Sequence, residues 1–396
     1  MVGNLLNEKE RFRFSHSGSL ALHLIRGVTA QAVVFGHALS FFEITQKYSL
    51  VQNSGVVVFF ILSGIVIPYS ALNKKETDSR YSFISYFIDR FSRIYTGFVP
   101  GLLFVALLDL IYKSRFEDLY GYADAFNLRT FIGNLFMFQD HPIFSLIHNE
   151  AFQQCLAEHS VNVFAIREYG AMPILTSFGS GRPFWTIAVE WWIYMLFGWI
   201  VFAKSPKKKS PIMYWPLLLL LMVVPGYHLI NGPGNGLAMM WIMGLIVYVV
   251  LSQGAISMSG SNVYFVASMF FVFALMRLAL SMEAYDLLYV ALLSMSLFFL
   301  LHGLQKKVGI ASGWVASLIT FMANFSFTLY LVHYTLLEMV LRWLGSGLKT
   351  MMIGIVLSNF LAILLYLFFE RNYKKVGKWL KNIFDIRQEK LGFHEQ

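Results

Sequence analysis

The chain has 396 residues, of which 57% are hydrophobic and only 13% are charged. Soluble domains carry about 25% charged residues, so this composition excludes an ordinary water-soluble protein and indicates many membrane spans. The net charge of +9 is better explained by membrane topology than by nucleic acid, and we expect no nucleic-acid partner. The single cysteine, Cys155, excludes a disulfide bond within the chain.

Apolar runs long enough to cross a bilayer follow one another along the chain and predict an all-α integral membrane protein with about ten transmembrane helices. The candidate spans cover residues 20–42, 51–72, 94–112, 184–203, 213–230, 237–252, 261–281, 286–303, 314–341 and 350–370. We expect one membrane domain over 1–375, which includes a long loop at 113–183, and a short tail at 376–396.

Lys and Arg are distributed unevenly between the two sides that these spans define. An even number of spans places both termini on one side, and most basic residues fall there, among them Lys74, Lys75 and the stretch 204–209. Short loops rich in Lys and Arg stay in the cytoplasm. The sequence therefore predicts a multi-pass protein of the cell (inner) membrane with both termini cytoplasmic and the long loop outside.

Two ionisable side chains, Arg26 and His37, lie within the apolar first span. Such groups are costly inside a membrane and are functional candidates by default. Eleven residues bring both onto one face of a helix, roughly 16 Å apart along its axis. One helix thus presents a cation near one membrane surface and an imidazole near the other.

The second and third spans contribute two further motifs. Small residues at Gly55, Ser63 and Gly64 allow close approach of either another helix or a ligand, and both interpretations stay open. Arg90 and Arg93, three residues apart, share one helical face at the start of the third span. Arginines at such a position also serve as topology signals or extend their side chains to the membrane surface.

The fourth and ninth spans carry polar groups that a purely structural helix does not need. Glu190 lies about two turns inside the fourth span, in a stretch that begins at Trp185. Ser326, Tyr330 and His333 are spaced i, i+4, i+7 and share one face of the ninth span. A structural carboxylate and a hydrogen-bonded core histidine are the alternatives to a reactive site.

Counting residues from the ends of the spans divides these ionisable groups by depth. The outer third of the membrane is expected to hold His37, Glu190 and His333, and the cytoplasmic end to hold the three arginines. Cations at one depth and an acid–base set at another indicate a conduit between two substrates.

The long loop carries several residues that can ligate metals: Glu117, Asp118, Asp124, Asp140, His141, His148, Glu150, Glu158, His159 and Glu168. They show no metal-ligand spacing such as two histidines four residues apart with a glutamate between them. We expect a solvated loop that packs over the membrane domain, and no metal site.

Six segments, in order from about residue 20 to 375, together resemble the membrane acyltransferase family 3. They are Arg26 to His37, Phe59 to Gly64, Arg90 to Arg93, Trp185 to Trp191, Ser326 to His333 and Phe369 to Arg371. The resemblance implies a ten-helix membrane enzyme that acylates glycans or other acceptors, commonly from acetyl-CoA. It also implies essential roles for the arginine and histidine of the first span and for the paired arginines of the third.

The chemistry of these side chains fits that resemblance. Arg26, Arg90 and Arg93 offer planar donors for the phosphates of an acyl-CoA substrate, and we expect no tightly bound cofactor. His37 can act as general base on an acceptor hydroxyl, with Glu190 orienting it and His333 nearby. Direct transfer and a covalent acyl-histidine both remain open. The expected supporting residues are Ser63, Trp185, Ser326 and Tyr330.

The main alternative is a proton-coupled transporter or flippase of a glycan or small molecule, in which the same groups relay protons or grip a substrate. The absence of a recognisable inverted repeat counts against it. A different membrane acyltransferase family and a nonenzymatic scaffold are weaker alternatives. The expected partners are an acyl-CoA, a hydroxyl acceptor such as a cell-envelope glycan, and membrane lipid; the sequence leaves the oligomeric state open.

Overall fold

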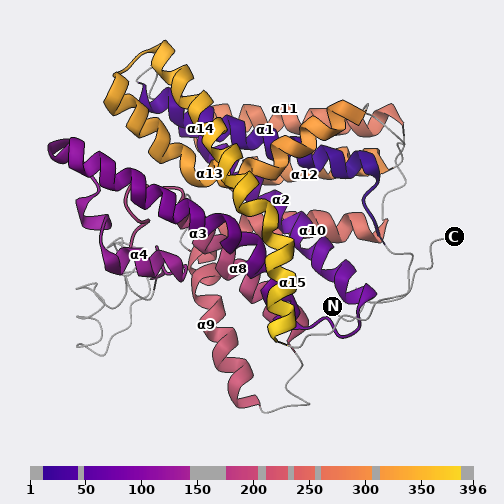
Figure 1. Ribbon diagram of the computed structural model, residues 1–396. Helices are drawn as coiled ribbons and strands as arrows, with labels where there is room; N and C mark the ends of the chain where they lie inside the picture. The colour runs from indigo at the N-terminus through magenta and orange to yellow at the C-terminus, as the bar shows by residue number, and fades with distance from the viewer. Residues whose placement is uncertain are drawn as a thin grey trace, which may run out of the picture.

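The computed structural model describes residues 12–42, 49–142, 175–203, 211–230, 236–254, 260–305 and 313–384. These residues are almost wholly helical and contain no strand (Figure 1). The long apolar helices are α1 (His16–Phe41), α2 (Ser49–Thr77), α3 (Phe83–Arg115), α8 (Phe184–Phe202), α9 (Pro211–Ile230), α10 (Leu237–Gln253), α11 (Ser261–Ser281), α12 (Leu287–Gln305), α13 (Gly313–Leu344) and α14 (Leu348–Phe368). The shorter elements are η3 (Glu117–Leu119), η4 (Ala123–Ala125), α4 (Leu128–Leu135), η5 (Glu370–Asn372) and α15 (Tyr373–Ile383).

Every apolar segment predicted as a span is a helix, which confirms the all-α, multi-pass architecture. Eight helices in the described residues are long and apolar enough to cross a membrane. The apolar parts of α9 and α10, Tyr214–Leu229 and Leu237–Gln253, are shorter. The fold class is therefore confirmed, whereas the number of ten crossings is not.

Helix α1 packs between α13 and α2, and glycines set how closely these helices approach. Helices α2 and α10 also approach each other closely, because a Cβ atom added at Gly64 would lie 2.1 Å from the carbonyl oxygen of Trp241. A Cβ atom at Gly244 would lie 2.1 Å from the carbonyl oxygen of Ile61. Helix packing is thus the reason for a glycine at position 64.

Helix α8 begins deep in the protein, because the residues before it fold back between the helices. Ser180 donates its backbone N–H and its hydroxyl to the buried carboxylate of Asp109 on α3, at 2.8 and 2.6 Å. The ring of Phe184 packs against that of Phe98, with centroids 5.3 Å apart. Since Phe98 lies near the middle of α3, the first turn of α8 starts about halfway along that helix.

The chain turns through η5 after α14 and continues as α15, which packs against α3. Positions 373, 377 and 381 form the inner face, and a Cβ atom at Gly377 would lie 2.9 Å from the hydroxyl of Ser92. Figure 1 shows α15 in yellow, crossing the bundle beside α3. The segment expected as a tail from 376 is therefore helical as far as Ile383, and the expected boundary at 375 falls inside this helix.

Candidate active site

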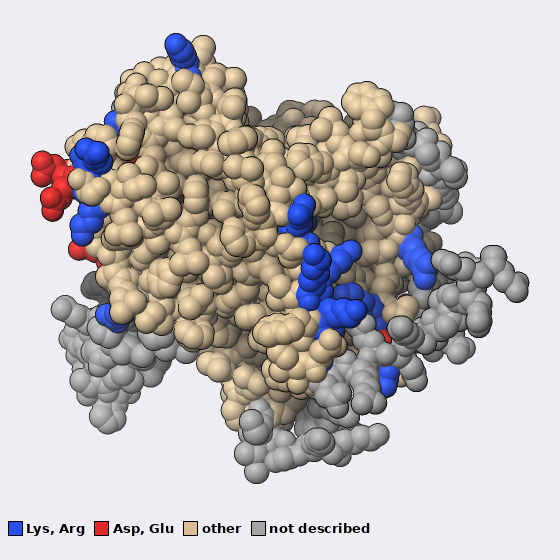
Figure 2. All heavy atoms as spheres, viewed as in Figure 1, with Lys and Arg blue, Asp and Glu red and all other residues tan. Residues whose placement is uncertain are grey.

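A cavity of about 1100 Å³ opens between α1, α2, α3, α8, α13 and α15. This volume exceeds the range of about 300 to 1,000 Å³ that is usual for small-molecule sites, which indicates a large ligand. Seven basic side chains line the cavity: Arg26, Lys74, Arg90, Arg93, Lys374, Lys378 and Lys381. Two acidic side chains accompany them, Asp89 and Glu190. We call the end of the bundle that holds the lysines the basic end; Figure 2 shows Lys and Arg gathered over α15 in a surface that is otherwise mostly uncharged.

The three arginines that the sequence assigns to the cytoplasmic end, Arg26, Arg90 and Arg93, all line this cavity. Their surroundings differ. Neither Arg26 nor Arg90 forms an ion pair with any described residue, and the Nε atom of Arg90 is buried without a hydrogen-bond partner. Unpaired guanidinium donors in a cavity wall are suited to bind an anion from outside the protein.

Arg93, in contrast, is held within the protein. Its Nη1 atom lies 2.5 Å from the carboxylate of Glu370, a fully buried side chain. The same carboxylate accepts the hydroxyl of Thr328 at 2.5 Å, and the guanidinium of Arg93 lies over the ring of Tyr373 at 4.9 Å. This pair joins α3 to η5 and α13, so it fixes the start of α15.

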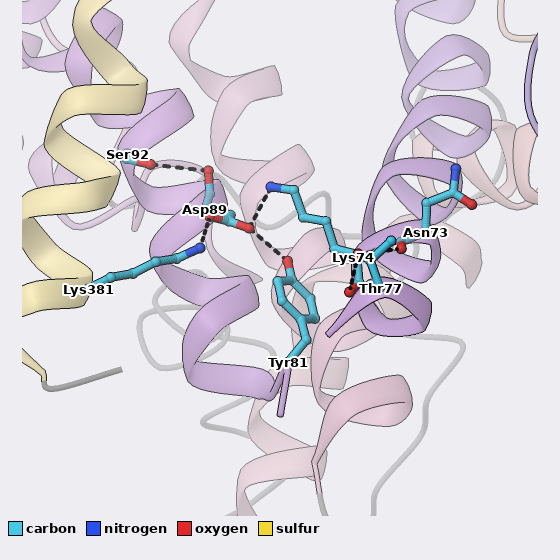
Figure 3. A network of polar contacts seen from close by, with 7 residues as sticks. All are labelled: Asn73, Lys74, Thr77, Tyr81, Asp89, Ser92 and Lys381. Atoms are coloured by element: carbon cyan, nitrogen blue, oxygen red, sulfur yellow. Dashed lines mark hydrogen bonds and ion pairs between the residues drawn. The ribbon is translucent and has the colours of Figure 1, made fainter. Parts of the chain in front are cut away.

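A second ionic cluster lies where α15 meets α2 and α3 (Figure 3). The carboxylate of Asp89 accepts Lys74 Nζ at 2.7 Å, Lys381 Nζ at 2.8 Å and the hydroxyl of Tyr81 at 2.9 Å. Lys74 comes from α2 and Lys381 from α15, so one carboxylate on α3 ties three helices together.

The inner end of the cavity is lined by hydroxyl groups and one carboxylate. The hydroxyls of Thr186 on α8 and Tyr330 on α13 lie 2.8 Å apart. One turn further along α8, Glu190 accepts a hydrogen bond from Tyr194. Ser63 and Ser326 also line the cavity, although each hydroxyl donates to a backbone carbonyl of its own helix. Hydroxyl groups therefore line the point where the cavity ends.

Just beyond that end lie the two histidines. The rings of His37 and His333 are 5.2 Å apart, and the ring of Tyr334 lies 5.1 Å from that of His37. The Nδ1 atom of His333 is 3.0 Å from the carbonyl oxygen of Leu329, which can only accept, so Nδ1 carries the proton. This leaves Nε2 of the neutral ring as a lone-pair acceptor, buried and without a hydrogen-bond partner.

The prediction that the two histidines share one depth is confirmed, but the prediction that Glu190 lies level with them is wrong. Helix α13 runs parallel to α3, and α8 runs antiparallel to both. Thr186 of α8 and Tyr330 of α13 are in contact and so lie at one depth. Glu190 is four residues from Thr186 along α8, toward the basic end, and His333 is three residues from Tyr330 along α13, away from the basic end. At 1.5 Å per residue, Glu190 and His333 are separated by roughly 10 Å in depth. The prediction of depth failed because α8 starts inside the protein, whereas counting residues from the end of the span assumes that the helix starts at the membrane surface.

Trp185 is the one expected site residue that the structure sets apart. Its ring stacks on that of His228 of α9 at 6.5 Å, and it does not line the cavity. The sequence also allows a structural role in which Glu190 pairs with Arg182 at the outer surface. The two side chains form no ion pair, and Arg182 lies instead near Glu338 and Tyr334.

Sequence reasoning missed much of the basic end. It gave no role in the site to Asp89, Tyr194 or Glu370, and it took the lysines of α15 only as part of the basic tail that indicates topology. The pattern Tyr373-Lys-Lys-Val-Gly-Lys-Trp-Leu-Lys has the periodicity of an amphipathic helix and could have revealed α15.

The described part of the long loop contains no group of three metal-ligating side chains. His148, Glu150, Glu158, His159 and Glu168 lie outside the described residues. Asp140 and His141 lie at the edge of the described loop, where burial raises the pKa of Asp140 to about 6 and lowers that of His141 to about 4. The ring of His141 packs against Trp192 of α8 at 5.2 Å, so His141 supports that helix.

Comparison with known proteins identifies the class. An all-helical membrane bundle with unpaired arginines in a large cavity and two histidines beyond its inner end has the parts of a group-transfer enzyme. A family model described as an acyltransferase domain matches residues 19–369, nearly the whole chain. The chain belongs to this acyltransferase family, family 3, and is a membrane acyltransferase. No curated protein and no solved structure matches it.

Proposed function

We propose that the protein transfers an acyl group, most simply acetyl, from an acyl-CoA to a hydroxyl of a cell-envelope glycan or related acceptor. The observation that carries this proposal is the cavity itself. It runs from a strongly basic opening to a hydroxyl-lined inner end, and the histidine pair lies directly beyond Tyr330. A long polyanion with a reactive group at its far end matches both ends of such a cavity.

The donor would bind with its phosphates among the basic residues and its thin pantetheine arm toward the inner end. Arg26 and Arg90 supply guanidinium groups that no described acidic side chain pairs. Arg93 contributes positive charge but is already bonded to Glu370, so its main role is to hold the cavity wall in shape. Thr186 donates its hydroxyl to the carbonyl oxygen of Pro183, so Tyr330 is the donor in its contact with Thr186. The hydroxyl of Tyr330 can turn from Thr186 to the thioester carbonyl oxygen as that oxygen gains negative charge.

The acceptor would approach the histidines from the opposite side. His37 takes the proton of the acceptor hydroxyl while the oxygen attacks the thioester carbonyl carbon. The carbon–sulfur bond breaks, and the CoA thiolate takes up that proton to leave as the thiol. The neighbouring His333 and Tyr334 orient the ring of His37, the role that sequence reasoning gave to Glu190. A covalent acyl-histidine would use the same groups in two steps.

This assignment requires that the protein lies in the inner membrane and that its basic end faces the cytoplasm, where acyl-CoA is available. Thiol labelling of intact cells tests it in a Cys155→Ser background. An impermeant reagent should label Lys349→Cys, at the opposite end of the bundle, and should leave Lys375→Cys on α15 unlabelled until the cells are opened. Labelling of Lys375→Cys from outside would contradict the proposed donor site.

The activity itself is tested with purified protein in liposomes. Labelled acetyl-CoA supplied on the side of the basic end should lose its acetyl group, slowly to water and faster when surface glycan is added on the other side. Substrate-dependent proton flux without loss of acetyl-CoA would instead support the transporter alternative. Mass spectrometry of surface glycans from cells with and without the protein then identifies the acceptor.

A further inference from the structure

Helix α15 presents two different flanks around its buried face. The flank toward the cavity holds Lys374, Lys378 and Asn382, and the flank away from it holds the exposed side chains of Trp379 and Ile383. An amphipathic helix with aromatic and aliphatic residues on one side lies in the membrane interface with that side toward lipid. The basic flank is therefore held facing the opening of the cavity.

The lysines at this opening fall into two kinds. Lys74 and Lys381 are both bonded to Asp89, so their charges are balanced within the protein (Figure 3). Lys374 and Lys378 also line the cavity, but neither pairs with a described acidic side chain, and both are exposed. Two unpaired ammonium groups one turn apart on a fixed helix repel each other unless an anion lies between them.

The exposure of these two lysines indicates which part of the donor they contact. The inner end, at Thr186 and Tyr330, is where the proposed function places the thioester. In an acyl-CoA the pantetheine arm separates the thioester from the pyrophosphate, and the 3′-phosphate of the adenosine lies at the far end. Arg26 and Arg90 are half-buried in the cavity wall, whereas Lys374 and Lys378 are exposed at its mouth. The two arginines therefore suit the pyrophosphate, and the two lysines suit the phosphate that stays nearest to solvent.

We infer that Lys374 and Lys378 of α15 bind the 3′-phosphate of the acyl-CoA donor, so that this helix selects coenzyme A over thioesters that lack this phosphate. The inference rests on the proposed function and extends it to residues beyond the region, 19–369, that the family model matches. The Arg93–Glu370 pair and the Asp89 cluster hold the helix in place, so the site is formed before the ligand arrives.

Equilibrium binding to the full-length protein in nanodiscs of zwitterionic lipid tests this inference, because such lipids offer no net charge to compete for the lysines. The two ligands are acetyl-CoA and acetyl-3′-dephospho-CoA, which differ only in the 3′-phosphate. The test variant is Lys374→Ala with Lys378→Ala. The matched control is Lys375→Ala, which removes one charge from the same helix at an exposed position that does not line the cavity.

The unmodified protein should bind acetyl-CoA roughly tenfold or more tightly than the dephospho form, as expected for a charge-assisted contact. The double variant should bind both ligands with the weaker affinity, and Lys375→Ala should keep the full ratio. Equal binding of both ligands by the unmodified protein would overturn the inference and leave the proposed function standing. A double variant that still discriminates would also overturn it, and binding of neither ligand would overturn both proposals.

Discussion

Arg93 and Glu370, 277 positions apart in the chain, form an ion pair of 2.5 Å in which the carboxylate is fully buried. Removing one partner of a buried pair leaves an uncompensated charge and costs about 3 to 5 kcal/mol of stability. We therefore expect Arg93→Ala to lower the thermal unfolding temperature of the purified protein markedly. The double variant Arg93→Met with Glu370→Leu, which removes both charges and keeps the volume, should recover most of that loss.

Arg90→Ala serves as the comparison for Arg93. Because Arg90 has no ion pair among the described residues, its loss should change stability little and raise the Km for acetyl-CoA roughly tenfold. If Arg93→Ala instead left the unfolding temperature unchanged and raised Km as Arg90→Ala does, the two arginines would share one ligand-binding role.

His37→Ala should lower kcat for acyl transfer by about 100-fold or more, the usual contribution of a general base, while folded protein is still obtained. His23→Ala is the matched control, since it removes an imidazole from the same helix nearly four turns away. Transfer to a glycan acceptor, measured beside thermal unfolding, separates the two variants. Full activity of the His37 variant would remove it as the base.

For Glu190 the structure changes the expectation. If Glu190 oriented His37, its change to glutamine would lower kcat. Glu190 lies instead roughly 10 Å in depth from the histidines and lines the anion-binding cavity. Glu190→Gln removes a negative charge from the path of a polyanion and should lower the Km for acetyl-CoA about two- to fivefold. The pH profile of kcat should stay the same. A large fall in kcat with unchanged Km would restore the catalytic role.

Asp140 and His141 should change the stability of the protein in opposite directions as the pH falls. Burial raises the pKa of Asp140 from 3.8 to about 6, so the folded protein binds this proton more tightly and gains stability as pH falls from about 6. Burial lowers the pKa of His141 from 6.5 to about 4, so the folded protein resists this proton and loses stability over the same range. In the unmodified protein the two effects largely cancel.

Single variants should expose each effect. When the pH falls from 7.5 to 5, the free energy of unfolding of His141→Phe should rise by on the order of 1 to 2 kcal/mol relative to the unmodified protein. That of Asp140→Asn should fall by a similar amount. Thermal unfolding at both pH values measures the difference. Parallel curves for all three proteins would contradict both pKa shifts.

The sequence determined the membrane class, the apolar helices and the spacing of polar residues within one helix. These features depend on composition and on periodicity within one helix, which are local properties of the chain. The regular rise of α1 is why Arg26 and His37 were placed correctly relative to each other, and the i, i+4, i+7 spacing of Ser326, Tyr330 and His333 followed for the same reason.

Only the tertiary structure decided which groups meet between helices. It paired Arg93 with Glu370 and left Arg90 unpaired, although the two arginines lie three residues apart on one helix. It set Glu190 at the level of the cations, because the chain before α8 folds inward to Asp109 and the helix starts deep. The height of a helix relative to its neighbours depends on contacts between residues far apart in sequence, and no pattern within one span records it.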